Sequence, residues 1–221
     1  MSEIINYYDK IATEYDSDRF ANSYGKFIDR QERKILNKLL SKKDELVLDL
    51  ACGSGRLLNY ADFGVDGSQE MIKIAQQKYP NKEIFHADAE KLPFENNSFD
   101  AIISFHFFMH LDEEKIKNIL VECSRILKPG GRLIFDIPSA HRRKLIAYNK
   151  DGWHGNLALS KADITKLHPD FVVKRCFGLL FLPIHRIPKK IRMRIIGVDF
   201  LFANSFLKKY SSYHVYEMIK K

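Results

Sequence analysis

A short apolar run that ends in a glycine-rich turn constrains the fold of this chain more than any other segment. Residues Leu46–Ala51 are typical of a buried parallel strand, and Cys52-Gly-Ser-Gly55 follows directly. Gly53 and Gly55 allow the backbone to turn sharply and to approach a ligand closely. The ligand would lie at the carboxyl end of a sheet, against the start of the next helix. Leu58 stands where a dinucleotide fingerprint has its third glycine, which disfavours a nicotinamide-dependent oxidoreductase.

Strand and helix patterns alternate through the first two thirds of the chain. The predicted strands after the first cover residues 63–66, 83–87, 99–104 and 132–137. The predicted helices cover residues 3–16, 22–41, 68–79 and 112–127, with Asn22 or Ser23 as the cap of the second. Such alternation indicates an α/β fold, in which helices cover both faces of a parallel sheet.

The pattern changes after Ser139. We expect helices at 141–148 and 160–167, a glycine-rich loop at 149–156, and two final strands at 171–177 and 213–219. Residues 179–211 are predicted to form an insertion over the end of the sheet. We therefore interpret 1–221 as one domain, with a helical cap at 1–43, a cofactor-binding core at 44–139 and a substrate side at 140–221.

Acidic residues follow two of the predicted strands. Asp66 ends the second strand, where its carboxylate could accept both hydroxyls of a ribose, and Asp88 follows the third, where it could accept from an exocyclic amine. Either residue alone is more typical of a turn or a helix cap. In order behind the glycine turn, the two acids indicate a nucleoside site.

The successive segments LDLACGSGRL, GVDGSQEMIKIA, HADAEKLPFENNSFDAIIS and RILKPGGRLIFD resemble the motifs of class I S-adenosylmethionine-dependent methyltransferases of the small-molecule kind. The resemblance covers about residues 45–138. It implies a Rossmann-like three-layer sandwich, with a seven-stranded sheet whose last strand is antiparallel, and S-adenosylmethionine as the cofactor. The short gap between Gly55 and Asp66 is a departure, and it leaves Asp62 as a weaker candidate for the ribose.

The resemblance also implies the contacts of the cofactor. The residues expected to surround it are Tyr15, Arg19, Ala51, Gly53, Gly55, Asp66, Gly67, Met71, Asp88, Ala89, Ser104 and Phe105. For Tyr15 and Arg19 the alternatives are ordinary packing and a surface position.

Three residues are candidates for catalysis. His106 and His110 follow the fourth strand, and we favour His106 as a general base because it is nearer the strand end. Tyr8 lies on the N-terminal helix, seven residues before Tyr15. Each of the three has packing or solvation as an equally good interpretation. No H-E-x-x-H pattern accompanies the histidines, so we expect no metal.

The glycine-rich loop contains Trp153 and His154, which we expect to line the substrate pocket, with a plug at the edge of the core as the alternative.

Charge is divided unevenly between the two parts of the chain. The whole chain carries 36 Lys and Arg against 28 Asp and Glu, a formal charge of +8. Residues 140–221 hold 17 basic and 5 acidic residues, so this part alone carries +12. The charge therefore lies on the predicted substrate side. We expect it to serve a substrate lid first, transient contact with an anionic membrane second and RNA binding last.

These observations together predict a methyltransferase that acts on O or N of a small, acidic or partly apolar metabolite. The alternative is an RNA- or membrane-associated S-adenosylmethionine-binding protein that acts on RNA or on a lipid or quinone. The first residues show no signal-peptide pattern, and three scattered cysteines fit a reducing compartment, so we expect a cytoplasmic protein, monomeric or homodimeric.

Overall fold

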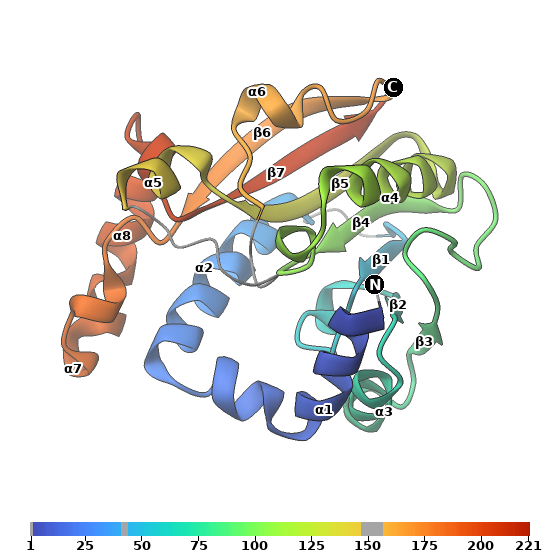
Figure 1. Cartoon of the computed structure of the whole chain (residues 1–221), viewed down its shortest axis with the longest axis horizontal. Coiled ribbons are helices and arrows are strands. Elements are labelled where there is room, and N and C mark those ends of the chain that lie inside the picture. Colours follow the sequence, from blue (N-terminus) through green and yellow to red (C-terminus); the bar gives the residue numbers. More distant parts are fainter. Residues whose placement is uncertain (1, 41–43, 147–156) are drawn as a thin grey trace.

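A seven-stranded sheet forms the centre of the computed structural model, which describes residues 2–40, 44–146 and 157–221 (Figure 1). The strands are β1 (Val47–Leu50), β2 (Phe63–Asp66), β3 (Glu83–His86), β4 (Phe99–Ser104), β5 (Leu127–Pro138), β6 (Phe171–Leu179) and β7 (Tyr213–Lys220). Their order across the sheet is β3-β2-β1-β4-β5-β7-β6. Strands β1 to β5 pair in parallel, and β7 is antiparallel to both β5 and β6. The predicted fold class, including the antiparallel last strand, is confirmed.

Helices α1 to α6 lie where the sequence predicts them, with shifts of a few residues at their ends, whereas α7 and α8 lie in the segment that was predicted only as an insertion. They are α1 (Ser2–Arg19), α2 (Ser23–Leu39), α3 (Gln69–Lys78), α4 (Glu113–Ile126), α5 (Ala140–Leu145), α6 (Lys161–Ile164), α7 (Lys189–Arg192) and α8 (Ile196–Ala203). The side chain of Asn22 caps α2, and Ser160 forms a capping box with Asp163 at α6. Between Gly55 and Asp66 there is only one short 3-10 turn, Leu58–Tyr60, in place of a longer helix.

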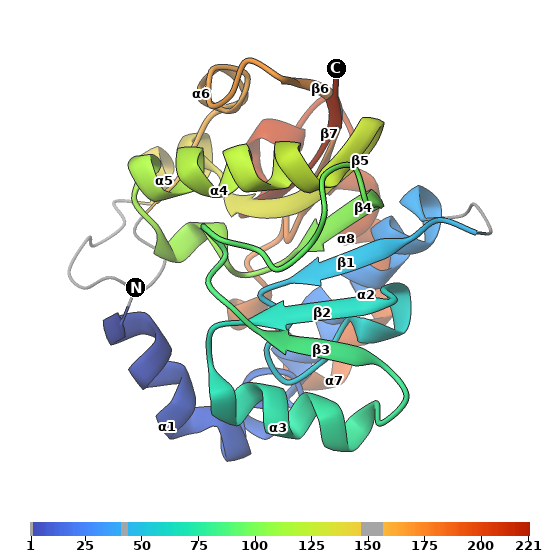
Figure 2. The ribbon, with the colours of Figure 1, turned by 90° about the vertical axis from the view of Figure 1, so that its right-hand side faces the viewer.

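Strand side chains alternate between two apolar layers. Leu48 and Leu50 pack in the same cluster as the apolar face of α4, whereas Val47 packs with Ile35 and Leu36 of α2. Figure 2 shows α4 and α2 on opposite sides of the sheet. The glycine turn and the ends of β2, β4 and β5 therefore meet at one edge, where both layers of helices leave the strand ends open.

The segment between β6 and β7 packs against α2. It consists of short helical turns and of α7 and α8, which lie along the outer edge of the molecule (Figure 1). Leu180 and Ile184 of this segment form a small core with Phe27 and Ile28 of α2. In the described part of the chain, no helix has the length and apolar character needed to cross a membrane.

Candidate active site

The turn after β1 is held open by unusual backbone angles and by one carboxylate. Ala51, Gly53 and Gly55 all have positive φ, at 59°, 53° and 83°. Asp66 at the end of β2 accepts hydrogen bonds from the backbone N–H of Gly53 at 2.7 Å and of Ser68 at 2.8 Å. Burial raises the pKa of Asp66, and these two donors oppose that rise. The carboxylate thus joins the ends of two neighbouring strands into one rigid wall.

A pocket lies against this wall, at the carboxyl ends of β1, β2 and β4. A Cβ added to Gly53 would meet nothing within 4 Å, so the glycine leaves space beside the turn. The residues lining the pocket are Ile4, Ile5, Tyr8, Tyr15, Leu50, Ala51, Gly53, Val65, Asp66, Gly67, Ser68, Met71, Ala87, Asp88, Ala89, Phe105, His106, Phe107 and His110.

Helix α1 covers the pocket and is fixed by polar contacts. Asp9 accepts from the hydroxyl of Ser68 at 2.6 Å, and Asp16 accepts from the hydroxyl of Ser54 at 2.6 Å. On the face toward the pocket, the hydroxyl of Tyr8 lies 3.1 Å from Nε2 of His110. Helix α1 is therefore tied to both the glycine turn and the turn after β4.

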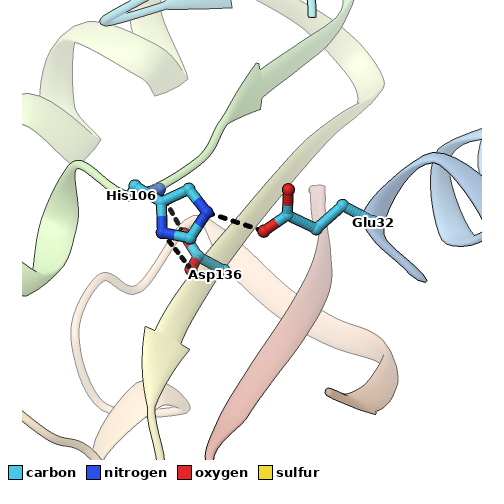
Figure 3. Close-up of side chains that lie close together, drawn as sticks. All are labelled: Glu32, His106 and Asp136. Carbon is cyan, nitrogen blue, oxygen red and sulfur yellow. Dashed lines mark hydrogen bonds and ion pairs between the residues drawn. The ribbon is translucent and has the colours of Figure 1, made fainter. Parts of the chain in front are cut away.

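His106 lies between two buried carboxylates, as Figure 3 shows. Its Nε2 is 2.7 Å from Oε1 of Glu32, on α2, and its Nδ1 is 3.7 Å from Oδ2 of Asp136, on β5. The backbone N–H of His106 donates to Oδ1 of Asp136 at 2.6 Å, which holds the residue at a φ of 58°. The imidazole is therefore oriented by two elements that are distant in sequence.

Neighbouring charges of opposite sign shift the pKa values of Glu32 and His106. Arg56 contacts Glu32 at 2.8 Å and Asp29 at 2.6 Å. Burial alone would raise the pKa of Glu32, but Arg56 and His106 outweigh it and lower that pKa to about 2. Burial alone would lower the pKa of His106, but the carboxylates of Glu32 and Asp136 raise it above its ordinary value. The ring is thus more readily protonated than a free histidine.

The same three side chains have the composition of a metal site. Their potential ligand atoms all lie within 4.8 Å of one another. However, the two carboxylates approach different ring nitrogens, and Arg56 already pairs with Glu32. We therefore interpret the cluster as an imidazole held between carboxylates.

A second cavity begins beside the pocket, and Tyr8, Tyr15, His106 and His110 line both. Its walls come from the α1–α2 junction, the ends of β4 and β5, α5, and the start of the segment after β6. Among the described residues that line it, four are arginines, Arg19, Arg142, Arg143 and Arg186, and one is an acid, Asp18; His185 also lines it. Its apolar and aromatic lining residues are Phe20, Tyr24, Ile28, Met109, Pro138, Ile146, Leu180, Leu182, Pro183, Ile184 and Tyr213.

Comparison with known proteins identifies the domain. Residues 48–135 match the methyltransferase domain family. An S-adenosylmethionine-dependent methyltransferase of Thermotoga maritima has the same fold, with a TM-score of 0.71 at 18% identity over 98% of this chain and 99% of that one. A second, from Clostridium acetobutylicum, gives a TM-score of 0.66 at 20% identity over 96% and 98% of the two chains. Residues 48–135 therefore form a methyltransferase domain, and the chain has the fold of S-adenosylmethionine-dependent methyltransferases.

Curated relatives of the methyltransferase domain match over part of their length. An uncharacterized protein of Methanocaldococcus jannaschii is 42% identical over 149 residues, 66% of this chain and 56% of that protein. A demethylmenaquinone methyltransferase of Thermotoga maritima is 37% identical over 137 residues, 58% of each. A ubiquinone/menaquinone biosynthesis C-methyltransferase of Campylobacter jejuni is 31% identical over 60% of this chain and 62% of that one. The chain thus spans a little over half the length of these relatives.

The pocket of the methyltransferase domain fits S-adenosylmethionine, the cofactor of this family. The open space at Gly53 admits a ligand against the backbone, and the carboxylates of Asp66 and Asp88 line the same pocket as the apolar side chain of Met71. An apolar pocket with a few convergent polar groups is what a nucleoside cofactor requires.

Most of the predicted cofactor residues line this pocket, and three do not. Gly55 packs against Leu58, Ser104 is buried at the end of β4, and Arg19 lines the second cavity instead. Asp62, the weaker candidate for the ribose, accepts from the N–H of Val47 away from the pocket. Of the catalytic candidates, Tyr8, His106 and His110 all line both cavities. Trp153 and His154 fall outside the described residues.

Sequence reasoning missed the partners of His106. Glu32 lies on the apolar face of α2, four residues after Ile28 and three before Ile35, and Asp136 interrupts the apolar run of β5. A charged residue on an apolar helix face or within a buried strand is a signal that these positions are special. That both residues contact His106 follows only from the fold, because Glu32 and Asp136 are 104 positions apart in the sequence.

Proposed function

We propose that this protein transfers the methyl group of S-adenosylmethionine to a small acceptor that combines an anionic group with an apolar part. The observation that carries the proposal is the second cavity, which shares four lining residues with the cofactor pocket. Arginine is suited to phosphate and carboxylate recognition, and the apolar walls suit a hydrocarbon or aromatic body. In this proposal, basic residues of the 140–221 part of the chain bind the anionic group of the acceptor.

His106 has the setting of a general base for this reaction. S-adenosylmethionine supplies a methyl group that is already activated for attack by a nucleophile. His106 lines both cavities, so its imidazole can take a proton from an acceptor O–H or N–H at Nδ1. Glu32 contacts the other nitrogen, and Oδ2 of Asp136 lies 3.7 Å from Nδ1, beyond hydrogen-bond distance. The Glu32 carboxylate then stabilises the imidazolium, as an orienting acid does in a catalytic triad.

A carbon acceptor is the second candidate. One relative is named as a demethylmenaquinone methyltransferase, and another as a C-methyltransferase of ubiquinone and menaquinone biosynthesis. An apolar quinone precursor with an ionisable hydroxyl fits the same combination of basic and apolar walls. Deprotonation of that hydroxyl by His106 would make the adjacent ring carbon nucleophilic.

The test is a transfer of labelled methyl from S-adenosylmethionine to extracts separated into polar acids, quinone precursors and RNA. We expect label in a small acidic or phenolic product, lost in Arg142→Gln with Arg143→Gln while cofactor affinity by calorimetry stays within twofold. Product analysis distinguishes O-, N- and C-methylation. Label confined to RNA, or no cofactor binding, would contradict the proposal.

A further inference from the structure

Helix α8 presents an apolar face to the outside of the molecule. Seven of its eight residues are apolar or glycine, and the only polar one, Asp199, is fully buried. Its outward side carries Val198, Leu201 and Phe202, with exposed fractions of 51%, 70% and 40%. A helix that is apolar on all sides is normally buried in a core or in a membrane. In this molecule one side of it faces outward.

Neighbouring turns extend this surface. Phe206, in the turn after α8, is 91% exposed, and Ile191 on α7 is 41% exposed. Basic side chains stand among them, since Lys189, Lys190, Arg194 and Lys209 are all exposed. We define the α7–α8 surface as Lys189, Lys190, Ile191, Arg194, Val198, Leu201, Phe202, Phe206 and Lys209. Figure 1 shows α7 and α8 at the outer edge of the molecule, beyond α2.

The charge of this region has a single sign. Residues 179–211 contain seven Lys and Arg and one acid, Asp199. Asp199 is engaged inside, where it accepts from the amide of Gln31 at 2.6 Å and from the N–H of Leu182 at 2.6 Å. Negative charge is therefore absent from the α7–α8 surface as defined, and a binding partner must be anionic and must also bury large apolar side chains.

We propose that the α7–α8 surface binds an anionic lipid bilayer, with the apolar side chains entering the interface and the basic ones contacting the headgroups. A second copy of this chain is a poorer occupant, because a two-fold interface would bring the same basic residues against each other. Nucleic acid is also a poorer occupant. Phe202 and Phe206 offer rings for stacking, but Ile191, Val198 and Leu201 offer no hydrogen bonds to base edges and gain nothing from contact with them.

The surface and part of the wall of the second cavity belong to one segment of the chain. Leu182, Ile184 and Arg186, which line that cavity, belong to the same segment between β6 and β7 as α7 and α8. If the proposed function holds, the segment that contacts the bilayer also forms part of the wall of the acceptor cavity. Binding to the bilayer itself does not depend on that function.

The experiment is flotation of the full chain with vesicles of phosphatidylglycerol and phosphatidylcholine in equal parts, and with vesicles of phosphatidylcholine alone. We expect binding to the first, little to the second, and weaker binding as salt rises. Lys189→Gln with Lys190→Gln should weaken binding roughly fivefold per lysine, which corresponds to about 1 kcal/mol per basic residue at an anionic surface. Leu201→Ser with Phe206→Ser should weaken it about tenfold or more, because buried apolar area is lost.

Val172→Ser with Lys174→Gln is the matched control. Val172 is 50% exposed, and Lys174 is exposed on the same edge strand, β6. Both precede Gly178, the residue of β6 whose N–H is bonded to Asn204 at the end of α8. The control should bind vesicles as the wild type does, and all variants should retain S-adenosylmethionine affinity, which reports folding. The proposal would be overturned if the control lost as much vesicle binding as the α7–α8 variants, or if either α7–α8 variant floated like the wild type. It would also be overturned if the wild type were a dimer that did not bind vesicles and that dissociated in Leu201→Ser with Phe206→Ser. Failure to find methyl transfer would leave the vesicle result standing.

Discussion

At the scale of single residues, His106 shows what a sequence can and cannot specify. Its position after β4 was sufficient to mark it as a candidate base. Its protonation behaviour depends on Glu32 and Asp136, which reach it from α2 and β5. The chemistry of this histidine is therefore set by two carboxylates that no local pattern connects with it.

The pKa of His106 should fall when Glu32 becomes glutamine. The Glu32 and Asp136 carboxylates raise that pKa, whereas burial and Arg56 lower it, so loss of the Glu32 charge should lower the pKa of His106 relative to the wild type. The Hε1 shift of His106, assigned with His106→Gln, can be followed by NMR from pH 5 to 9. Glu122→Gln on α4 removes a carboxylate elsewhere and should leave the titration unchanged. An unaltered His106 titration in Glu32→Gln would contradict the assigned ion pair.

Asp49 on β1 predicts a pH-dependent stability. Burial raises its pKa to about 8, with a further contribution from the nearby charge of Asp66. The unfolded carboxyl loses its proton near pH 4, whereas the folded one keeps it until about pH 8, so its contribution to stability is lost as pH rises through this window. Asp49→Asn should therefore gain stability relative to the wild type between pH 5 and 8.5, on the order of a few kcal/mol.

Urea unfolding of both proteins at the two pH values measures this difference. Asp44→Asn, an exposed carboxylate just before β1, should show no such change. If Asp49→Asn and the wild type differed in unfolding free energy by the same amount at both pH values, the pKa of Asp49 would not be raised.

At the scale of elements, local patterns carried the prediction far. Strand runs, the helix cap at Asn22 and the glycine turn all stand where the sequence indicates them. Helix ends shifted by a few residues because tertiary contacts decide the last turn. The two glycines of the turn proved different in kind, since Gly53 faces the pocket and Gly55 faces the packing of Leu58 and Ala75.

Gly53→Ala and Gly55→Ala should therefore separate binding from folding. Both place an alanine at positive φ, which costs about 1–2 kcal/mol. In Gly55→Ala the new Cβ would also lie 3.0 Å from Leu58 Cδ1 and 3.2 Å from Ala75 Cβ, so stability should fall further. In Gly53→Ala the Cβ enters the space of the cofactor, and calorimetry should show at least a tenfold (~1.4 kcal/mol) loss of S-adenosylmethionine affinity.

Gly130→Ala is the control, because Gly130 also has positive φ and open space at Cβ but lies outside the pocket. It should lose as much stability as Gly53→Ala and keep its cofactor affinity. If Gly53→Ala bound the cofactor as well as Gly130→Ala does, the pocket would not hold the ligand as assigned.

At the scale of the whole molecule, the sequence predicted the cofactor side of the site more completely than the acceptor side. The cofactor residues follow one another at strand ends, so their order in the chain reveals their meeting point. The acceptor cavity is assembled from five separate segments, and its basic residues were visible only as a charge imbalance. Arg19 illustrates the limit. It ends α1 and lines the second cavity, and that cavity exists only once α2 and the inserted segment pack beside α1.

The inserted segment between β6 and β7 should be separable from the cofactor core, and Asp199 is the residue that tests this. Asp199 accepts from Gln31 and from the N–H groups of Leu182 and Phe181. Asp199→Ala therefore leaves the buried amide of Gln31 unpaired, at about 1–3 kcal/mol, and two partly buried N–H groups unpaired at a smaller cost. We expect a lower melting temperature and faster hydrogen exchange at the amides of Phe181 and Leu182. Affinity for S-adenosylmethionine should stay within twofold, since no residue of this segment lines that pocket, whereas turnover of an acceptor should fall at least tenfold as the cavity wall loosens.

Asp170→Ala is the control for Asp199→Ala. It removes an exposed acid that accepts from Ser124 and should change none of the binding measurements. A parallel loss of cofactor affinity in Asp199→Ala would mean instead that the segment and the core fold as one inseparable unit.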